Sequence, residues 1–363
     1  MQYILISLAA IIGLLALGTL LFVWLSPQMG QAPKGKDLER IQTSINFKNK
    51  KFINLQKTEM GDTWEALKKT PEMFSKEGKE PTEPLPSEFQ LIKNTAADSA
   101  YVTWYGHSAF LLSLKEQRVL IDPMFGTYAS PLPFGSKRYA YANEIPVDAI
   151  MPVDVVLISH DHYDHLDYPT IKKIKDKVGV FLVPLGLGSH LKSWDVPKEK
   201  IIELDWWQTH TLDGITYTAT PARHFSGRGL TDRDATQWSG WAVKTATLNI
   251  YYSGDSGYGD HFRTIGQKLG PFDFALIECG QYNETWAQIH MMPEESVAAS
   301  IDVGAKIVLP VHWGAFRLAP HGWTESVERF TKEADAKGQA YVTPTIGERF
   351  NINHLPKTNA WWR

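Results

Sequence analysis

The chain has little cysteine and almost no net charge. Cys279 is the single cysteine among 363 residues, which excludes an internal disulfide and a zinc site built from several thiolates. The formal net charge is only −3, so no basic field favours DNA or RNA, and we expect no nucleic-acid partner. Any metal ion must therefore be bound by His, Asp or Glu side chains.

Charge is also absent from residues 3–25, YILISLAAIIGLLALGTLLFVWL, a stretch long enough to cross a hydrocarbon layer of roughly 30 Å. No Lys or Arg precedes it and no clear small-x-small cleavage site follows it, which favours an anchor over a cleaved signal peptide, the alternative. The first basic residues, Lys34, Lys36 and Arg40, follow the span and weakly favour a cytoplasmic body. We expect a single-pass N-terminal membrane anchor, with the lipid bilayer as a partner.

The remaining chain divides by composition. Residues 1–27 form the anchor (or signal), 28–100 an extended arm rich in Lys, Pro and Glu, 101–353 a globular domain, and 354–363 a C-terminal tail. Within the arm, residues 62–69 are one short helix candidate. From residue 101 onward, short apolar β-branched runs alternate with polar turns and helical stretches, which predicts an α/β fold. The strand candidates are residues 102–114, 118–123, 154–160, 178–184, 215–224, 248–255, 274–280 and 306–312, and the helix candidates are residues 169–178, 293–303 and 325–336.

Residues 159–165, SHDHYDH, contain three histidines and two aspartates directly after the apolar run VDVVLI. His160 and His162 leave the strand two residues apart and on the same side, so one metal ion can bind both imidazoles. Asp164 and His165 follow in the turn, where they can bind a second ion. A solvated polar loop is the alternative, which this density of ligands after a buried strand disfavours.

Three further residues, His224, Asp255 and His312, each end a strand candidate, as His160 does. Side chains at strand ends can meet at one edge of a sheet. The predicted site binds one ion through His160, His162 and His224 and another through Asp164, His165 and His312, with Asp255 bridging. Nitrogen and oxygen ligands favour two Zn²⁺ ions, with iron or manganese as alternatives. Such a pair, about 3.5–4 Å apart, activates water for hydrolysis of a phosphodiester, lactone or related ester.

Other residues are candidates for supporting roles. Asp122, in VLIDPMF, is expected to orient a ligating imidazole by accepting its free N–H, although it could instead cap a turn. His107 either lines the site or is structural. For proton transfer the candidates are Asp164, His290 and His321, and both histidines could equally be ordinary loop residues.

Several long blocks resemble one family. They are TWYGHSAFLL, LIDPMFGTYASPLPFGSKR, PARHFSGRGLTDRDATQWSGWAV, YYSGDSGYG, HMMPEESV and VHWGAF. Over roughly residues 101–353 the chain resembles the N-acyl-phosphatidylethanolamine-hydrolysing phospholipases D, in their membrane-anchored bacterial branch, within the metallo-β-lactamase superfamily. The resemblance implies an αββα sandwich, two zinc ions, and release of an N-acylethanolamine and phosphatidic acid. It also favours His290, in the block IHMMPEE, as an active-site residue.

The sequence departs from the mammalian members at residues 281–288, QYNETWAQ, which lack their Pro and Arg, so headgroup and acyl selectivity stay open. We predict a binuclear zinc hydrolase that cleaves phosphodiester bonds of membrane phospholipids, with N-acyl-phosphatidylethanolamine as the leading substrate. One alternative is a metal-dependent lactonase acting on a small sugar or acyl lactone. Another is a membrane-tethered, non-catalytic metal-binding protein. An apolar groove beside the metals would favour the lipid, and a small polar pocket the lactone.

Overall fold

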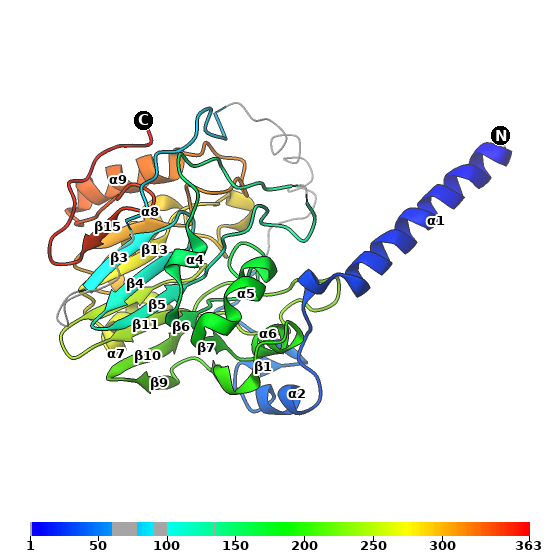
Figure 1. Cartoon of the computed structure of the whole chain (residues 1–363), viewed down its shortest axis with the longest axis horizontal. Coiled ribbons are helices and arrows are strands. Elements are labelled where there is room, and N and C mark those ends of the chain that lie inside the picture. Colours follow the sequence, from blue (N-terminus) through cyan, green and yellow to red (C-terminus); the bar gives the residue numbers. More distant parts are fainter. Residues whose placement is uncertain (1, 60–77, 91–99, 134) are drawn as a thin grey trace.

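The computed structural model describes residues 2–59, 78–90, 100–133 and 135–363, and the helix predicted at residues 62–69 lies outside them. In the described part of the chain, two large sheets pack face to face and helices cover their outer faces (Figure 1). The arrangement confirms the predicted αββα sandwich.

The first sheet has seven strands in the order β15-β3-β4-β5-β6-β7-β8. Its strands are β3 (Ala100–Trp104), β4 (Phe110–Leu114), β5 (Gln117–Ile121), β6 (Val153–Leu157), β7 (Val178–Pro184), β8 (Ile201–Leu204) and β15 (Arg349–Asn351). Strands β5 to β8 run parallel, whereas β15, β3, β4 and β5 pair antiparallel. The ends of β5 and β6 therefore lie at the same edge of the sheet.

The second sheet has six strands in the order β14-β13-β12-β11-β10-β9. Its strands are β9 (Thr209–Leu212), β10 (Ile215–Thr220), β11 (Gly240–Lys244), β12 (Asn249–Tyr252), β13 (Phe274–Glu278) and β14 (Val308–Val311). Strands β12, β13 and β14 are parallel, and the others pair antiparallel. The parallel strands again bring their C-terminal ends together.

Side-chain alternation assigns each strand's residues to two layers. On β4, Phe110 points between the sheets and packs against Tyr252 of β12, with ring centroids 5.4 Å apart. Leu111 points the other way, into the cluster that Leu120 shares with the outer helices. The main core therefore lies between the two sheets, and a second core lies under the helices on the seven-stranded sheet.

Helices cover both outer faces. On the seven-stranded sheet lie α4 (Val147–Ile150), α5 (Tyr168–Ile174) with the 3-10 turn η2 (Lys175–Lys177), and α6 (Gly188–Ser193); η3 (Lys198–Lys200) leads into β8. On the other sheet lie α7 (His261–Leu269), α8 (Pro293–Asp302) and α9 (Glu325–Lys337), and η4 (Glu284–Trp286) precedes α8. Asp167 caps α5 by accepting the N–H of Thr170 at 3.1 Å, and Pro293 begins α8.

Most predicted strands are present, but the single strand predicted at residues 102–114 is wrong. It is two strands, β3 and β4, because Gly106 and His107 adopt positive φ and reverse the chain between them. The prediction missed β8, β9, β11 and β15 and the helices α4, α6 and α7. Most of these elements are short, and β9 exposes alternate residues on an edge, whereas β11 and α7 are as long as elements that were predicted.

At the N-terminus, α1 (Gln2–Leu25) projects from the body (Figure 1), and its window Leu5–Leu25 is long and apolar enough to cross a membrane. Residues 27–59, which we call the strap, return to the body through η1 (Pro27–Met29), α2 (Lys36–Ile41) and the hairpin β1 (Phe47–Lys48) and β2 (Lys51–Phe52). At the other end, Trp361 stacks on Trp313, with ring centroids 5.3 Å apart.

Candidate metal centre

The predicted ligands lie where strands of both sheets end. His160 follows β6, His224 follows β10, Asp255 follows β12, and His312 directly follows β14. Gly254 allows the Asp255 loop to approach the motif loop, residues 159–165, because a Cβ at its φ of 60° would lie 2.5 Å from the carbonyl oxygen of Ser239 and 3.2 Å from Cβ of Ser159. The sandwich thus gathers side chains that are far apart in sequence.

Three imidazoles form one group. Nε2 of His160 lies 2.8 Å from Nδ1 of His162, which lies 3.1 Å from Nε2 of His224. Oδ2 of Asp255 faces the group, 3.7 Å from Nε2 of His160 and 3.9 Å from Nε2 of His224. The four side chains therefore direct nitrogen and oxygen atoms at one point, which is the geometry a single metal ion needs.

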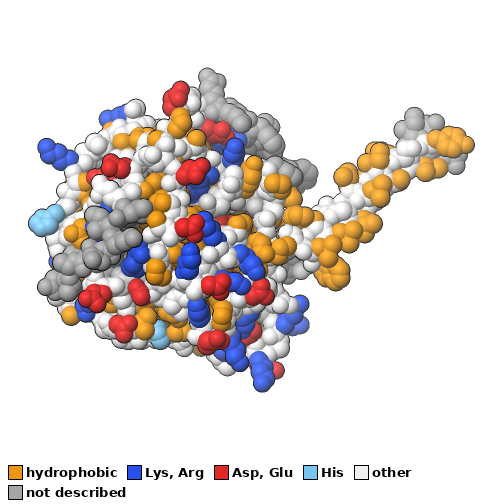
Figure 2. Space-filling view, viewed as in Figure 1, with side chains coloured by type: hydrophobic (Ala, Val, Ile, Leu, Met, Phe, Trp, Pro, Cys, Tyr) orange, Lys and Arg blue, Asp and Glu red, His pale blue; other side chains and the backbone are white. Residues whose placement is uncertain are grey.

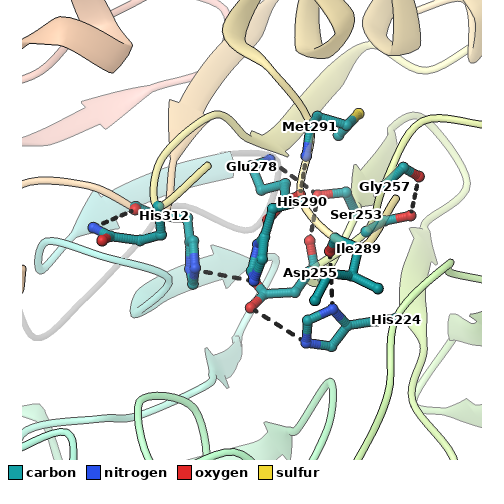
Figure 3. A network of polar contacts seen from close by, with 12 residues as sticks. His224, Ser253, Asp255, Gly257, Glu278, Ile289, His290, Met291 and His312 are labelled. Atoms are coloured by element: carbon teal, nitrogen blue, oxygen red, sulfur yellow. Dashed lines mark hydrogen bonds and ion pairs between the residues drawn. The ribbon is translucent and has the colours of Figure 1, made fainter. Parts of the chain in front are cut away.

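Asp255 also borders a second group. Its Oδ2 lies 3.1 Å from Nε2 of His165, and its Oδ1 lies 3.2 Å from Nδ1 of His312. Oδ2 of Asp164 lies 3.3 Å from Nε2 of His165 and 4.0 Å from Nε2 of His312. Figure 3 shows Asp255 between His224 on one side and His312 on the other. All seven residues of the sequence prediction are thus brought together, in the two predicted groups.

Asp122 orients a ligand of the second group through hydrogen bonds. Its Oδ2 lies 2.8 Å from Nδ1 of His165 and accepts the hydroxyl of Tyr252 at 2.6 Å. Its Oδ1 accepts the backbone N–H of Ser159 at 2.7 Å. The carboxylate is fully buried, so these bonds fix the ring of His165 and leave its Nε2 directed at the cluster.

His107 contacts the cluster through Asp164, because its Nε2 lies 2.8 Å from Oδ2 of that carboxylate. His107, Asp122 and His312 all adopt positive φ, at 53°, 38° and 71°. A side chain in this backbone region costs about 1–3 kcal/mol, and such residues concentrate at functional sites. The strained backbone here coincides with the residues that surround the cluster.

The electrostatics of the cluster suit a cation. Burial lowers the pKa of His160 and His224 well below the usual range and that of His162 to about 4, so these imidazoles are neutral, as metal ligands must be. Burial acts to lower the pKa of His165, but Asp255 and Asp164 outweigh it and raise that pKa well above its usual range, so in the metal-free cluster this ring carries a proton that a metal ion would replace. Burial acts to raise the pKa of Asp164, but the charge of His165 and the hydrogen bond to His107 outweigh it and hold that pKa well below its usual range. Two buried atoms, Nε2 of His165 and Oδ1 of Asp255, lie 3.1 and 3.2 Å from atoms of Asp255 and His312 but have hydrogen-bond geometry with none of the described residues. A metal ion is the partner that fits them.

A cavity of about 290 Å³ opens beside the cluster. Its lining residues are His162, Asp164, Phe225, Asp255, Gln281, Trp286, Ile289, His290, His312 and Leu318. Nδ1 of His290 lies 3.0 Å from Oε2 of Glu278, and the ring of His290 stacks on that of His312 with centroids 5.4 Å apart. His290 therefore lines the cavity, and Figure 3 shows it beside Asp255 and His312.

His321 has a different environment. Its Nε2 accepts the backbone N–H of Gln281 at 3.0 Å, its Nδ1 donates to the carbonyl oxygen of Gly322 at 2.8 Å, and its ring stacks on Tyr282. Both ring nitrogens are thus engaged in hydrogen bonds with backbone atoms, and His321 is not among the residues lining the cavity. The structure does not bring this histidine to the cluster, and we do not propose it for proton transfer.

Sequence reasoning missed three residues of the site. Glu278 ends β13 as the predicted ligands end their strands, a signal that was available in FALIECG. Burial raises the pKa of Glu278 well above its usual range. Gln281 and Trp286 line the cavity from the segment 281–288, whose departure from the mammalian pattern already pointed to substrate contact.

Comparison with known proteins agrees with this geometry. The family model for the beta-lactamase superfamily domain matches residues 117–313. An uncharacterised protein of Mycobacterium tuberculosis is 38% identical over 374 residues, covering 99% of this chain and 98% of the relative. The N-acyl-phosphatidylethanolamine-hydrolyzing phospholipase D 1 of Caenorhabditis elegans is 34% identical over 270 residues, covering 68% of this chain and 74% of the relative.

Among solved structures, Igni18, a metallo hydrolase from the archaeon Ignicoccus hospitalis, is similar in fold, with a TM-score of 0.55 at 19% identity, covering 70% of this chain and 98% of that one. The buried His/Asp cluster, the family model and the relatives agree with one another. The chain belongs to the beta-lactamase superfamily and, within it, to the family of the N-acyl-phosphatidylethanolamine-hydrolyzing phospholipases D, and it is a metal-dependent hydrolase.

Proposed function

We propose that this hydrolase cleaves phosphodiester bonds of membrane phospholipids, with N-acyl-phosphatidylethanolamine as the leading substrate. The observation that carries the proposal is the cavity, because Phe225, Trp286, Ile289 and Leu318 wall a space that opens directly onto the metal cluster. Apolar walls beside a charged centre match a lipid, whose phosphate must reach the metals while its chains stay out of water.

We assign the metal ligands as two sets. His160, His162 and His224 would hold one ion, Asp164, His165 and His312 would hold the other, and Asp255 would bridge them. The all-nitrogen and oxygen donor set fits two Zn²⁺, and iron or manganese also suit it. When bound, such ions polarise the phosphoryl group and activate water for attack on phosphorus.

The chain's own side chains would then donate the proton that the leaving group needs and orient the metal ligands. Attack of water on phosphorus breaks the bond to the ethanolamide oxygen, which leaves as an alcohol only if it gains a proton. His290 is placed to supply it, since its Nδ1 contact with Glu278 leaves Nε2 toward the cavity. Asp122 orients His165 and His107 orients Asp164, so that the groups do not reorganise during the reaction.

We further propose that α1 anchors the protein in a bilayer. Figure 2 shows hydrophobic side chains along the projecting helix, whereas the visible face of the body carries mixed charges. An anchor would keep the body beside its lipid substrate. The division into anchor, arm, hydrolase domain and tail, and the weak preference for a cytoplasmic body, stay predictions.

The lactonase alternative is less well supported. A small, polar pocket would have favoured a sugar or acyl lactone, but the cavity here is walled by two aromatic and two aliphatic side chains, Phe225, Trp286, Ile289 and Leu318. We therefore keep phosphodiester cleavage as the proposed reaction.

A lipid turnover assay tests the proposal. Full-length protein in detergent micelles, loaded with Zn²⁺, is mixed with N-acyl-phosphatidylethanolamine, and the products are identified by mass spectrometry. We expect N-acylethanolamine and phosphatidic acid in equal amounts from the wild type. In Asp255→Asn we expect turnover to fall about 10²–10³-fold, the usual cost of removing a key electrostatic group. Absence of both products from a protein that retains two ions would refute this substrate, and a lactone panel would follow.

A further inference from the structure

The strap, residues 27–59, contacts the loops that carry the metal ligands. Near its start, the carbonyl oxygen of Gln28 accepts from Nε and Nη2 of Arg228, at 3.0 and 2.7 Å. The buried guanidinium also donates to the carbonyl oxygen of Leu166 at 2.8 Å, just after the histidine motif. The segment that follows α1 is thereby connected to the motif loop.

Further along, the strap becomes extended and Asn54 reaches the backbone of His224. Its Nδ2 donates to the carbonyl oxygen of His224 at 2.8 Å, and its Oδ1 accepts the backbone N–H of His224 at 3.1 Å. The same Oδ1 accepts Nε1 of Trp238 at 3.1 Å. One amide thus satisfies both backbone groups of a single residue, a task that requires a donor and an acceptor side by side.

The ring of His224 is fixed separately, because its Nδ1 lies 2.9 Å from the carbonyl oxygen of Ile289. The preceding residue, Arg223, is also held by the strap, donating to Oγ1 of Thr58 and to the carbonyl oxygen of Lys57, each at 3.0 Å. With Asn54 on the backbone of His224, the imidazole has little freedom to leave the cluster.

We propose that Asn54 is a positioning residue for His224, so that the strap is a working part of the metal centre and more than a linker from α1. The inference rests on the proposed metal ligation by His224. Without the Asn54 amide, the backbone N–H and C=O of His224 have no hydrogen-bond partner. Each such buried group costs about 1–3 kcal/mol unless the loop moves and forms new hydrogen bonds. A moved loop carries Nε2 of His224 away from His160 and His162.

The neighbouring amide provides a matched control. Gln56 lies two residues along the same extended segment, and its Nε2 donates to Oδ2 of Asp260 at 3.1 Å, five residues beyond Asp255 and directly before α7. Gln56→Ala therefore removes one strap–body bond without touching His224. Asn54→Ala removes both hydrogen bonds to the backbone of His224. Asn54→Asp keeps the size of the side chain and its acceptor oxygen but loses the N–H donor.

Full-length wild type and the three variants are compared in detergent. Zn²⁺ affinity is measured by competition with a chelator, and the absorption spectrum of the Co²⁺-substituted protein reports the ligand geometry. We expect both Asn54 variants to bind one of the two ions about 10–100-fold more weakly, as when a hydrogen bond supporting a ligand is lost, with an altered Co²⁺ spectrum. Gln56→Ala should match the wild type in both measurements.

Each other outcome decides against the inference. Wild-type affinity and spectrum in Asn54→Ala would overturn it while leaving the proposed function intact, as would an equal loss in Gln56→Ala. If Asn54→Ala fails to fold, the isosteric Asn54→Asp decides on the same two measurements. A wild-type protein that binds no metal ion would overturn the proposed function and this inference together.

Discussion

Nδ1 of His290 lies 3.0 Å from Oε2 of Glu278, whose Oε1 accepts the backbone N–H of Met291 at 2.9 Å. Whichever partner carries the proton, the contact fixes the ring of His290 and leaves Nε2 as the nitrogen that faces the cavity. Burial lowers the pKa of His290, so its protonated form is a minor species at neutral pH but gives up its proton readily, as delivery to a leaving group requires.

His290→Gln should therefore lower kcat for the phospholipid about 10²–10⁴-fold, the usual contribution of a general acid, while both metal ions stay bound. Measurement of kcat with a poor and an activated leaving group separates this role from a structural one. An activated leaving group needs no proton, so the defect should largely vanish there. His354→Gln, at an exposed histidine, is the control. Equal defects on both substrates would contradict the assignment.

Asp122→Asn should weaken metal binding about 10–100-fold, because the carboxylate that holds Nδ1 of His165 becomes a neutral amide. Chelator competition with a metal-sensitive dye measures the change. Asp195→Asn, which removes a surface ion pair with Lys172, should leave the affinity unaltered. Unchanged affinity in Asp122→Asn would mean that His165 needs no such partner.

Removing the metal ions should abolish activity and also lower stability, since the metal-free cluster leaves buried polar atoms unpartnered. Ions present at 1,000 times their Kd stabilise the native state by about 4 kcal/mol. Differential scanning calorimetry before and after chelation, followed by adding back Zn²⁺, measures the loss and its recovery. An unaltered melting temperature on chelation would argue against structural metal binding at this cluster.

Gly30→Ala should destabilise the start of the strap. Gly30 has φ 65° and ψ −151°, a region nearly restricted to glycine, and an added Cβ would lie within 2.2 Å of Nδ1 of His190. We expect a loss of about 1–3 kcal/mol, seen as a lower melting temperature. Gly18→Ala, within α1, meets no atom within 4 Å and replaces Gly with a better helix former, so it should not lower the melting temperature. A neutral Gly30→Ala would show that the strap does not dock at His190.

His261 should make folding sensitive to acid. It is buried with its Nε2 3.0 Å from Oγ of Ser256, and burial lowers its pKa to about 3. The unfolded chain binds a proton here below its ordinary pKa of about 6.5 and the native state does not, so stability falls as the pH drops from about 6.5 toward 3. Between pH 7 and pH 5 the loss amounts to about 2 kcal/mol.

His261→Gln removes this contribution of His261 to the pH dependence of stability. In metal-free protein, urea unfolding at pH 7 and pH 5 should show the variant losing about 2 kcal/mol less than the wild type over that interval. Identical pH dependence in the two proteins would mean that His261 takes up a proton without unfolding.

The sequence predicted the site better than its surroundings. His160, Asp255 and His312 were recognisable because an apolar run before each one predicts a strand, and parallel strands bring their ends together. The contact between Gln28 and Arg228 left no such signal, since Arg228 binds a backbone carbonyl oxygen that any residue could supply.

Asn54 was missed for a related reason. Its partners are backbone atoms of a residue 170 positions away, and nothing in residues 45–59 indicates where that segment docks. The sequence could not decide between an active-site and a structural role for His321. Its hydrogen-bond partners are backbone atoms, which only the folded loop brings next to it.

Only Ser26 separates the end of α1 at Leu25 from the start of η1 at Pro27. The carbonyl oxygen of Pro27 in turn accepts a hydrogen bond from Nε1 of Trp194 at 2.7 Å, so η1 is bound to the body. With α1 in a bilayer, so short a connection would keep the body close to the lipid surface. The enzyme would then meet its substrate by lateral diffusion within one leaflet. Its turnover would follow the mole fraction of the target lipid in that leaflet, and diluting the leaflet with inert lipid would slow it even when the amount of substrate in the tube is unchanged.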